Sequence, residues 1–209
     1  MDGIATPPSG AERIGLLVLV VGALLWSGIA PRDRLTWLLE VVWVIAALPL
    51  IVANWRRFPL TRLLSWLLAV HALVLIYGGT YTYAETPLGF WLRDLFGFVR
   101  NPWDRVGHFM QGFVPAILGR ELLLRLTPLQ RGGWLVYLVL AAALSFSALF
   151  ELIEWWAAFA FGADADAFLA TQGDQWDTQW DMFVCLLGAA LSLLLWSRLH
   201  DRQLGLRRS

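Results

Sequence analysis

Ionisable side chains recur at helical spacing in three segments of the second half of the chain. Asp104 and His108 are four residues apart and Gln111 follows three residues later, so a helix would present all three on one face. Glu151 and Glu154 are three residues apart. A third set has spacings of three and four residues: Asp174, Asp177 and Asp181. If the three segments are neighbouring helices, their carboxylates and the imidazole form one cluster.

This combination of groups is typical of metal binding or proton transfer. An imidazole with several carboxylates and no thiolate is a ligand set for Mg²⁺, Mn²⁺, Ca²⁺ or, through His108, Zn²⁺, and a divalent cation would offset repulsion among the acids. The hypothetical metal ligands are His108, Glu154, Asp177 and Asp181. Proton relay is an alternative, with the candidate catalytic residues Asp104, His108, Glu151, Glu154 and Asp181. As a third alternative, the groups pair only with one another and hold helices together.

Residues beside these acids are candidates for binding a substrate. Arg100 and Arg105 could bind the phosphate or carboxylate of a lipid-linked molecule, because a guanidinium group matches both. The predicted substrate-binding residues are Arg100, Asn101, Arg105, Gln111, Gln172 and Trp176. Polar residues earlier in the chain could line the same space: Glu40, Tyr77, Tyr81, Tyr83 and Glu85.

Other ionisable residues have simpler interpretations. Glu121 and Arg125 have the spacing of an i,i+4 ion pair. His71, in the middle of an apolar run, is expected to be a hydrogen-bonded packing residue. His200, near the end of the chain, is expected to be a solvated residue of a basic tail.

The elements that must position these residues are membrane-spanning helices. The chain has 209 residues, of which 58% are hydrophobic and 15% charged, and its mean hydropathy is +0.61. Long apolar runs predict one membrane domain over residues 1–209, an all-α polytopic bundle of about six spans. The predicted spans cover residues 14–30, 35–53, 60–83, 104–126, 134–161 and 177–196. Residues 88–98 are too short to cross a membrane and predict an amphipathic helix in the interface.

The arginines predict the orientation of the bundle, because short cytoplasmic loops are enriched in them. With six spans, eleven arginines fall on the side of the two termini: 13, 56, 57, 62, 120, 125, 131, 198, 202, 207 and 208. Five fall on the other side: 32, 34, 93, 100 and 105. Both termini are therefore expected on the cytoplasmic side of the membrane, with the acidic cluster on the opposite side.

Composition and missing motifs exclude several classes of function. A net charge of zero gives no indication of a nucleic-acid partner, and the single cysteine, Cys185, allows no intramolecular disulfide. The sequence has no Walker P-loop, no His-Glu-x-x-His pair and no Gly-x-Ser-x-Gly elbow. A nucleotide-driven pump, a zincin-type protease and an α/β-hydrolase are therefore not supported.

Three ordered motifs carry a family resemblance: RNPWDRVGHFMQG at 100–112, FELIEW at 150–155 and TQGDQWDTQWDM at 171–182. The chain from the third span to the sixth resembles the YjdF family of bacterial inner-membrane proteins, whose activity is unassigned. More distantly it resembles VanZ-like proteins, with matches at Asp104, His108, Phe109, Glu151, Asp181 and Gly188. VanZ-like proteins are associated with resistance to lipoglycopeptide antibiotics, which implies work on the cell envelope at the outer leaflet.

Three functions therefore remain open. The first is an envelope protein that binds or modifies a lipid or lipid-linked component at an outward-facing site, with a divalent cation as its one suggested cofactor. The second is a proton- or cation-coupled transporter, which would need ionisable groups across the membrane. The third is a structural or assembly protein in which the cluster only joins helices. The expected partners are the lipid bilayer and a lipid head group. The sequence decides neither whether the protein is an enzyme nor what its oligomeric state is.

Overall fold

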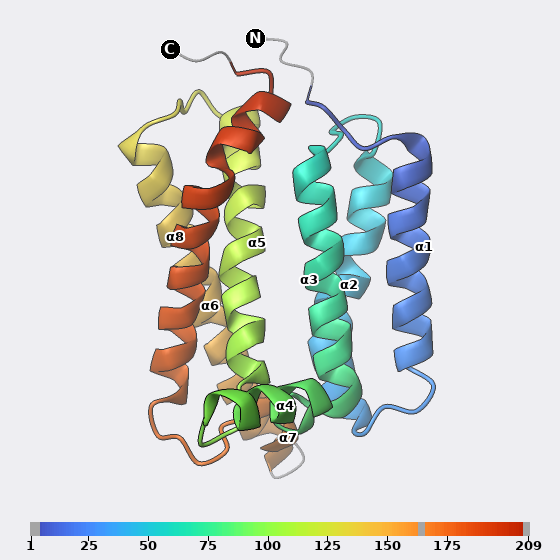
Figure 1. Cartoon of the computed structure of the whole chain (residues 1–209), viewed down its shortest axis with the longest axis vertical. Coiled ribbons are helices and arrows are strands. Elements are labelled where there is room, and N and C mark those ends of the chain that lie inside the picture. Colours follow the sequence, from blue (N-terminus) through green and yellow to red (C-terminus); the bar gives the residue numbers. More distant parts are fainter. Residues whose placement is uncertain (1–4, 163–165, 207–209) are drawn as a thin grey trace.

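The computed structural model describes residues 5–162 and 166–206, and over these ranges the chain is helical without a strand (Figure 1). The long helices are α1 (Gly10–Ser27), α2 (Arg34–Asn54), α3 (Arg62–Tyr81), α5 (Trp103–Leu126), α6 (Gly133–Phe161) and α8 (Asp177–Gln203). The short ones are η1 (Tyr83–Glu85), α4 (Pro87–Phe96) and α7 (Asp166–Leu169). The prediction of an all-α polytopic protein is confirmed, and α4 is the short helix expected near residues 88–98.

The first three helices begin at residues that cap a helix N-terminus. The hydroxyl of Ser9 accepts from the Glu12 amide at 3.2 Å while the Glu12 carboxylate accepts from the Ser9 amide at 3.1 Å, which is a capping box. Asp33 accepts from the Thr36 amide at 2.7 Å. Asp33 lies in the polar break between the first two apolar runs, so the sequence itself determines where α2 starts.

The long helices form two groups that run side by side in the bundle (Figure 1). One group contains α1, α2 and α3, the other contains α5, α6 and α8, and α3 packs against α5 between them. The two termini lie at one end of the bundle, whereas α4 and α7 lie at the other. We call these the terminal end and the distal end.

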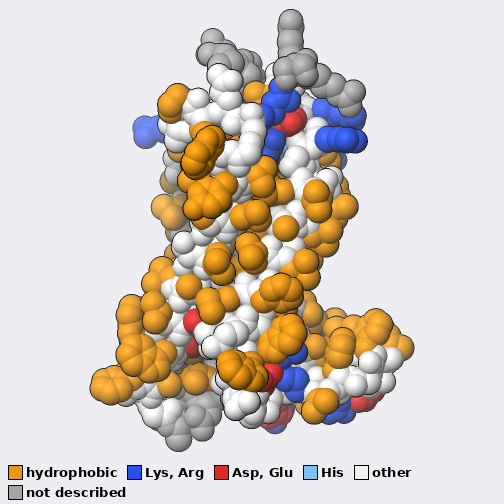
Figure 2. Space-filling view, turned by 90° about the vertical axis from the view of Figure 1, so that its left-hand side faces the viewer, with side chains coloured by type: hydrophobic (Ala, Val, Ile, Leu, Met, Phe, Trp, Pro, Cys, Tyr) orange, Lys and Arg blue, Asp and Glu red, His pale blue; other side chains and the backbone are white. Residues whose placement is uncertain are grey.

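Within residues 5–162 and 166–206, five helices are long and apolar enough to cross a membrane: α1, α2, α3, α6 and α8. Apolar side chains cover the middle of the face seen in Figure 2, and charged side chains gather toward its two ends, as expected for a bundle surrounded by lipid. The central helix α5 is not among the five, and it contains several charged residues that the other helices enclose. The predicted sixth span over residues 104–126 therefore stays a prediction.

Close packing of α5 against α8 fixes the relative position of these two helices. A Cβ atom added at Gly112 would collide with the backbone carbonyl of Cys185, and one added at Gly188 would collide with the carbonyl of Phe109. Only glycine fits at both positions, so the backbones approach as in other tightly packed membrane helices. This contact sets the first turns of α5 beside the first turns of α8.

A network of buried charges joins α3, α5 and α8 at the terminal end. The Glu121 carboxylate accepts from the amide and hydroxyl of Thr61 at 3.2 and 2.8 Å, from Arg125 at 2.6 Å and from His200 at 3.0 Å. Arg120 pairs with Asp201 and donates to His200 Nδ1 at 2.8 Å. We call this group the terminal cluster: Arg120, Glu121, Arg125, His200 and Asp201.

The terminal cluster confirms one expectation and corrects another. Glu121 and Arg125 form the predicted i,i+4 ion pair. The prediction for His200 was wrong, because its side chain is fully buried. Since a guanidinium can only donate, His200 Nδ1 is an acceptor and its Nε2–H donates to Glu121. The imidazole is thus held between an arginine and a glutamate, a role that the position of His200 near the chain end did not suggest.

Candidate functional site

The loop before α5 is tied to the loop before α8 by the side-chain amide of Gln172, which bonds to the backbone of Asn101. The Asn101 amide donates to Gln172 Oε1 at 3.0 Å, and Gln172 Nε2 donates back to the Asn101 carbonyl at 2.9 Å. The Asn101 side chain also accepts from the Trp103 amide at 3.0 Å and donates to the Thr86 carbonyl at 3.0 Å. Both residues were predicted to bind substrate, and here they position the start of α5.

Arg100 bridges the starts of α5 and α8. It pairs with Asp177 and lies 3.1 Å from Asp104 Oδ2, and it also donates to the Thr171 carbonyl at 3.0 Å. Burial lowers the pKa of Arg100, but the bond to Asp177 and the nearby carboxylates outweigh it and raise the pKa above its ordinary value. The guanidinium is thus charged, and its two terminal nitrogens are bonded to protein groups, whereas its Nε has no hydrogen-bond partner among the described residues.

Arg105, at the rim of the site, is likewise paired with an aspartate. Its guanidinium lies 2.6 Å from Asp174 Oδ2 and 5.4 Å from the ring centroid of Trp180. Trp176, another predicted substrate contact, is exposed immediately before α8. Of the six predicted substrate-binding residues, Gln111 alone makes a direct contact with His108.

Beneath this rim, three buried residues of α5 and α8 converge. Asp104, His108 and Asp181 each present a potential ligand atom, and these atoms lie within 4.8 Å of one another. His108 Nε2 is 3.7 Å from Asp104 Oδ1 and 3.7 Å from Glu151 Oε1 of α6, which is too long for a hydrogen bond. We call this group the distal cluster: Asp104, His108, Gln111, Glu151 and Asp181.

The bond from Gln111 determines which His108 nitrogen can bind a cation. His108 Nδ1 lies 3.0 Å from the carboxamide oxygen of Gln111, and because that oxygen only accepts, Nδ1 carries the proton. Nε2 of the neutral ring then presents a lone pair toward two carboxylates. A metal-binding histidine is oriented in the same way, by a hydrogen bond from its other nitrogen.

Two carboxylate oxygens of the distal cluster have no hydrogen-bond partner within the described part of the chain. They are Asp181 Oδ1 and Glu151 Oε1, on side chains with residue exposures of 2% and 9%. A buried acceptor without a partner costs about 1–3 kcal/mol. Such an oxygen can accept a hydrogen bond from water or bind a cation, so the inside of the distal cluster has unused acceptors.

The structure groups the hypothetical metal ligands differently from the sequence. His108 and Asp181 belong to the converging set, but Asp177 is paired with Arg100 and Glu154 is not part of the set. Asp104, proposed only as a catalytic residue, is the third member. Helical spacing placed each acid on a face but could not tell which faces meet.

Glu40 and Tyr83 line the pocket that adjoins the distal cluster, whereas other polar residues suggested for this space do not. Both are 4% exposed, and they share the pocket lining with Asp104 and His108. In contrast, Glu85 pairs with Arg32, and the Tyr77 hydroxyl accepts from the Leu88 amide at 3.0 Å. Burial, together with the charges of Glu40 and Asp104, raises the pKa of Tyr83 well above its ordinary value, so its phenol stays neutral.

Two glycines make room for the ring of Tyr83. A Cβ atom added at Gly78 of α3 would lie 2.6 Å from Tyr83 Cζ, and one added at Gly107 of α5 would lie 2.6 Å from its Cε1. Any larger residue at either position would displace the ring. The two glycines that fix the position of the Tyr83 ring lie on different helices. Their relation to Tyr83 is therefore visible in the fold and not in the sequence.

Comparison with known proteins gives a family but no structural precedent. A family model described as "Predicted membrane protein (DUF2238)" matches residues 13–202. Inner membrane protein YjdF of Escherichia coli (strain K12) is 51% identical over 181 residues, which cover 87% of each chain. No solved structure matches. The comparisons do not support the VanZ-like resemblance, but the YjdF resemblance is confirmed: the chain belongs to the DUF2238 family of predicted membrane proteins.

Proposed function

We propose that this protein resides in the bacterial inner membrane and binds the anionic head group of a lipid or lipid-linked envelope component at the distal cluster, through a divalent cation. The observation that carries the proposal is the convergence of Asp104, His108 and Asp181 around buried acceptors that lack a hydrogen bond. The inner-membrane location is inferred from the name of the E. coli relative.

The geometry of the distal cluster suits a cation better than direct contacts among its members. Ligands about 2.1 Å from a tetrahedral zinc ion lie about 3.4 Å apart. The 3.7 Å separation of His108 Nε2 from Asp104 is close to that value and too long for a hydrogen bond, and the ligand atoms of Asp104, His108 and Asp181 all lie within 4.8 Å of one another. A cation would also relieve the repulsion among the buried carboxylates.

Three protein ligands leave a coordination position for the lipid. Open metal sites in proteins have three protein ligands and bind water or substrate at the fourth position. A phosphate oxygen is a suitable fourth ligand, because hard anionic oxygens bind divalent cations well. Since Arg100 and Arg105 are engaged by aspartates, the cation supplies the positive charge that recognises the head group.

The position of α4 agrees with a site at the level of lipid head groups. Leu88, Trp91, Leu95 and Phe96 of this helix are exposed, and α4 lies at the distal end of the bundle (Figure 1). An amphipathic helix with such residues on one side lies in the membrane interface.

The two alternative functions have less support. A transporter needs polar groups across the membrane, but His71 is the only ionisable residue that lines the adjoining pocket between Glu40 and Arg13 in the described part of the chain. A purely structural cluster would be satisfied internally, as the terminal cluster is, and the distal cluster leaves acceptors unused.

Metal content of the purified protein tests the proposal. We expect one divalent ion per chain by elemental analysis after incubation with Zn²⁺ or Mn²⁺ and removal of excess metal. The near-isosteric substitution Asp181→Asn should abolish binding, whereas the control Asp174→Asn, at the Arg105 pair, should retain it. A wild-type protein that retains no metal after this treatment, or an equal metal content in the two variants, would contradict the cation site.

Labelling from each side of the membrane tests the orientation. Gln175 precedes α8 at the distal end and Gln130 lies between α5 and α6, and both are exposed. In a Cys185→Ala background, Gln175→Cys should react with an impermeant maleimide added outside the inner membrane, and Gln130→Cys only after permeabilisation. The reverse pattern would place the distal cluster in the cytoplasm.

A further inference from the structure

We infer that the pocket between the two helix groups holds one acyl chain of a phospholipid whose phosphate occupies the distal cluster. This inference rests on the proposed function and names the class of lipid. The pocket has a volume of about 360 Å³ and is lined by α1, α2, α3, α5 and two phenylalanines of α6. It joins the distal cluster at Asp104 and His108.

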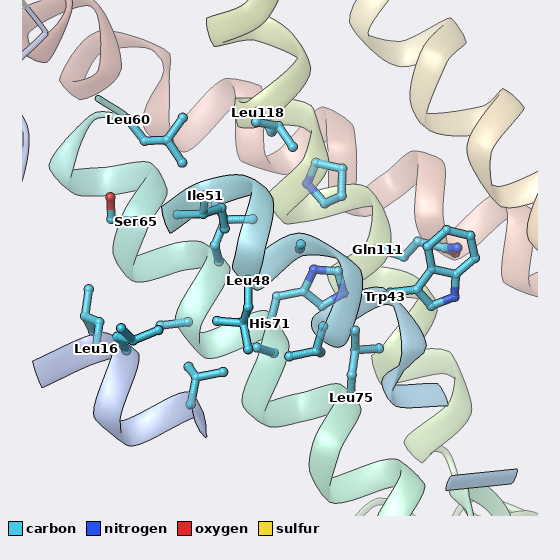
Figure 3. Close-up of a pocket in the computed structure, with 18 of the residues that line it drawn as sticks. Leu16, Trp43, Leu48, Ile51, Leu60, Ser65, His71, Leu75, Gln111 and Leu118 are labelled. Carbon is cyan, nitrogen blue, oxygen red and sulfur yellow. The ribbon is translucent and has the colours of Figure 1, made fainter. Parts of the chain in front are cut away.

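The lining of the pocket is suited to hydrocarbon. In Figure 3, apolar side chains from four helices, among them Leu16, Leu48, Leu75 and Leu118, surround the space. Apolar cavities stay dry and bind apolar molecules. A pocket of this volume has room for an acyl chain.

The pocket is also long enough to hold an acyl chain. On α2 the lining extends from Glu40 to Trp55, and a rise of 1.5 Å per residue makes this stretch about 22 Å long. One leaflet of the hydrocarbon core is about 15 Å thick. A phospholipid chain reaches about this depth, whereas a long polyprenyl chain would extend well beyond the pocket.

The polarity of the lining determines which way the lipid lies. Polar residues gather at one end, where Glu40, Tyr83, His108 and Gln111 meet the cluster. At the other end, the Arg13 guanidinium already donates to the carbonyls of Pro8 and Trp55 at 3.2 and 3.3 Å. The head group therefore belongs at the distal end and the chain points toward the termini.

His71 marks the middle of the pocket and corrects an expectation. Its ring is among the lining side chains in Figure 3, and its Nε2 is buried with no hydrogen-bond partner among the described residues. It was expected to be a hydrogen-bonded packing residue. A lone polar atom in an apolar lining does not provide a path for ions, and a hydrocarbon chain can pass beside it.

A photoreactive lipid tests the inference directly. The full-length protein is reconstituted into vesicles of phosphatidylethanolamine and phosphatidylglycerol that contain phosphatidylglycerol with a diazirine at the end of one acyl chain. After illumination, mass spectrometry should find cross-links on pocket residues such as Leu48 and Leu68. Labelling confined to outward-facing residues such as Leu50 and Ile45 would overturn the inference.

Neighbouring alanines of α2 provide a matched pair of variants. Ala47 lines the pocket, whereas Ala46 is exposed on the outer surface. Ala47→Trp should reduce pocket cross-linking at least fivefold, and Ala46→Trp should leave it unchanged. The milder Ala72→Leu, on α3 in the same lining, replaces Ala47→Trp if that variant does not fold. Equal cross-linking of pocket residues in wild type and in the variant that fills the pocket, Ala47→Trp or Ala72→Leu, would overturn the inference.

Two further measurements separate the possible failures. Metal content is determined on the same samples, so that a protein with metal but no pocket label contradicts the acyl-chain site alone. A pocket label without metal contradicts the cation site alone. If an unlabelled polyprenyl phosphate, but not unlabelled phosphatidylglycerol, displaces the label, the assignment to a phospholipid is overturned.

Discussion

The terminal and distal clusters lie at opposite ends of α5 and α8, and they differ in whether their buried charged groups have hydrogen-bond partners. In the terminal cluster, Glu121 receives hydrogen bonds from Thr61, Arg125 and His200. In the distal cluster, Asp181 and Glu151 each retain a buried oxygen with no partner among the described residues. The same helix pair thus forms one closed network and one receptive site, and the difference separates a structural role from a binding role.

The two histidines show the same contrast. His200 accepts from Arg120 and donates to Glu121, so both of its nitrogens are used within the protein. His108 donates to Gln111 and turns its other nitrogen toward carboxylates at 3.7 Å. A histidine with one nitrogen fixed and one facing acceptors is prepared for a cation, whereas His200 has no such capacity.

The largest expected effect comes from breaking the terminal cluster. Glu121→Ala leaves the charge of Arg125 and the His200 Nε2–H without their buried partner, and removal of one partner from a buried ion pair costs about 3–5 kcal/mol. Unfolding in mixed detergent micelles, followed by circular dichroism, measures the loss. A loss below 1 kcal/mol would show that the network contributes little and would weaken the comparison.

Metal binding at the distal cluster should change the free energy of unfolding by nearly as much. A ligand present at 100 times its dissociation constant stabilises a protein by about 2.7 kcal/mol. We expect this gain with Zn²⁺ or Mn²⁺ for wild type and no gain for Asp181→Asn. The metal-free Asp181→Asn protein should be at least as stable as metal-free wild type, because one buried like charge is removed.

Chelation provides the control for the metal effect. Treatment with a chelator should return wild type to the stability it has without metal and should leave Asp181→Asn unaffected. A metal gain that survives Asp181→Asn would place the binding elsewhere.

Gly112→Ala should disturb the contact that brings the distal cluster together. The added methyl group meets the Cys185 carbonyl, and overpacking of this kind costs about 1–3 kcal/mol. Metal affinity should fall as well, because α5 and α8 shift relative to each other. The measurements are thermal unfolding and metal titration.

Gly119→Ala on the same helix is the matched control. No atom lies within 4 Å of a Cβ added there, so this variant should retain metal and gain about 0.5–1 kcal/mol from helix propensity. If both alanine variants behave alike, the contact at Gly112 does not position the site.

The smallest effect is expected at the rim. Arg105→Gln breaks the pair with Asp174, whose side chains are 30% and 24% exposed, and such pairs contribute about 0–1 kcal/mol. Stability and metal content should therefore change little. A large loss of metal in this variant would mean that the rim, and not the inner set, holds the cation.

Local patterns predicted much of this arrangement. Hydropathy predicted the apolar helices, and the four-residue and three-residue spacings placed Asp104, His108 and Gln111 on one face of α5, where the bond from His108 to Gln111 forms. These inferences succeed because both depend on the period of a single helix.

Features that depend on how helices pack could not be predicted. Asp177 was expected to bind metal, but its pairing with Arg100 depends on two loops being held together by Gln172. His200 lies close to the chain end, yet it is buried because α8 extends beside Arg120. The pocket is likewise a property of the space between helix groups, which no single segment encodes.

Anomalous X-ray scattering from crystals grown with Zn²⁺ tests the central claim most directly. We predict one strong peak between α5 and α8, within about 2.0–2.2 Å of His108 Nε2 and of one carboxylate oxygen each from Asp104 and Asp181. A map with no peak at the distal cluster, or with metal bound at the terminal cluster instead, would contradict the distinction between a receptive site and a closed network.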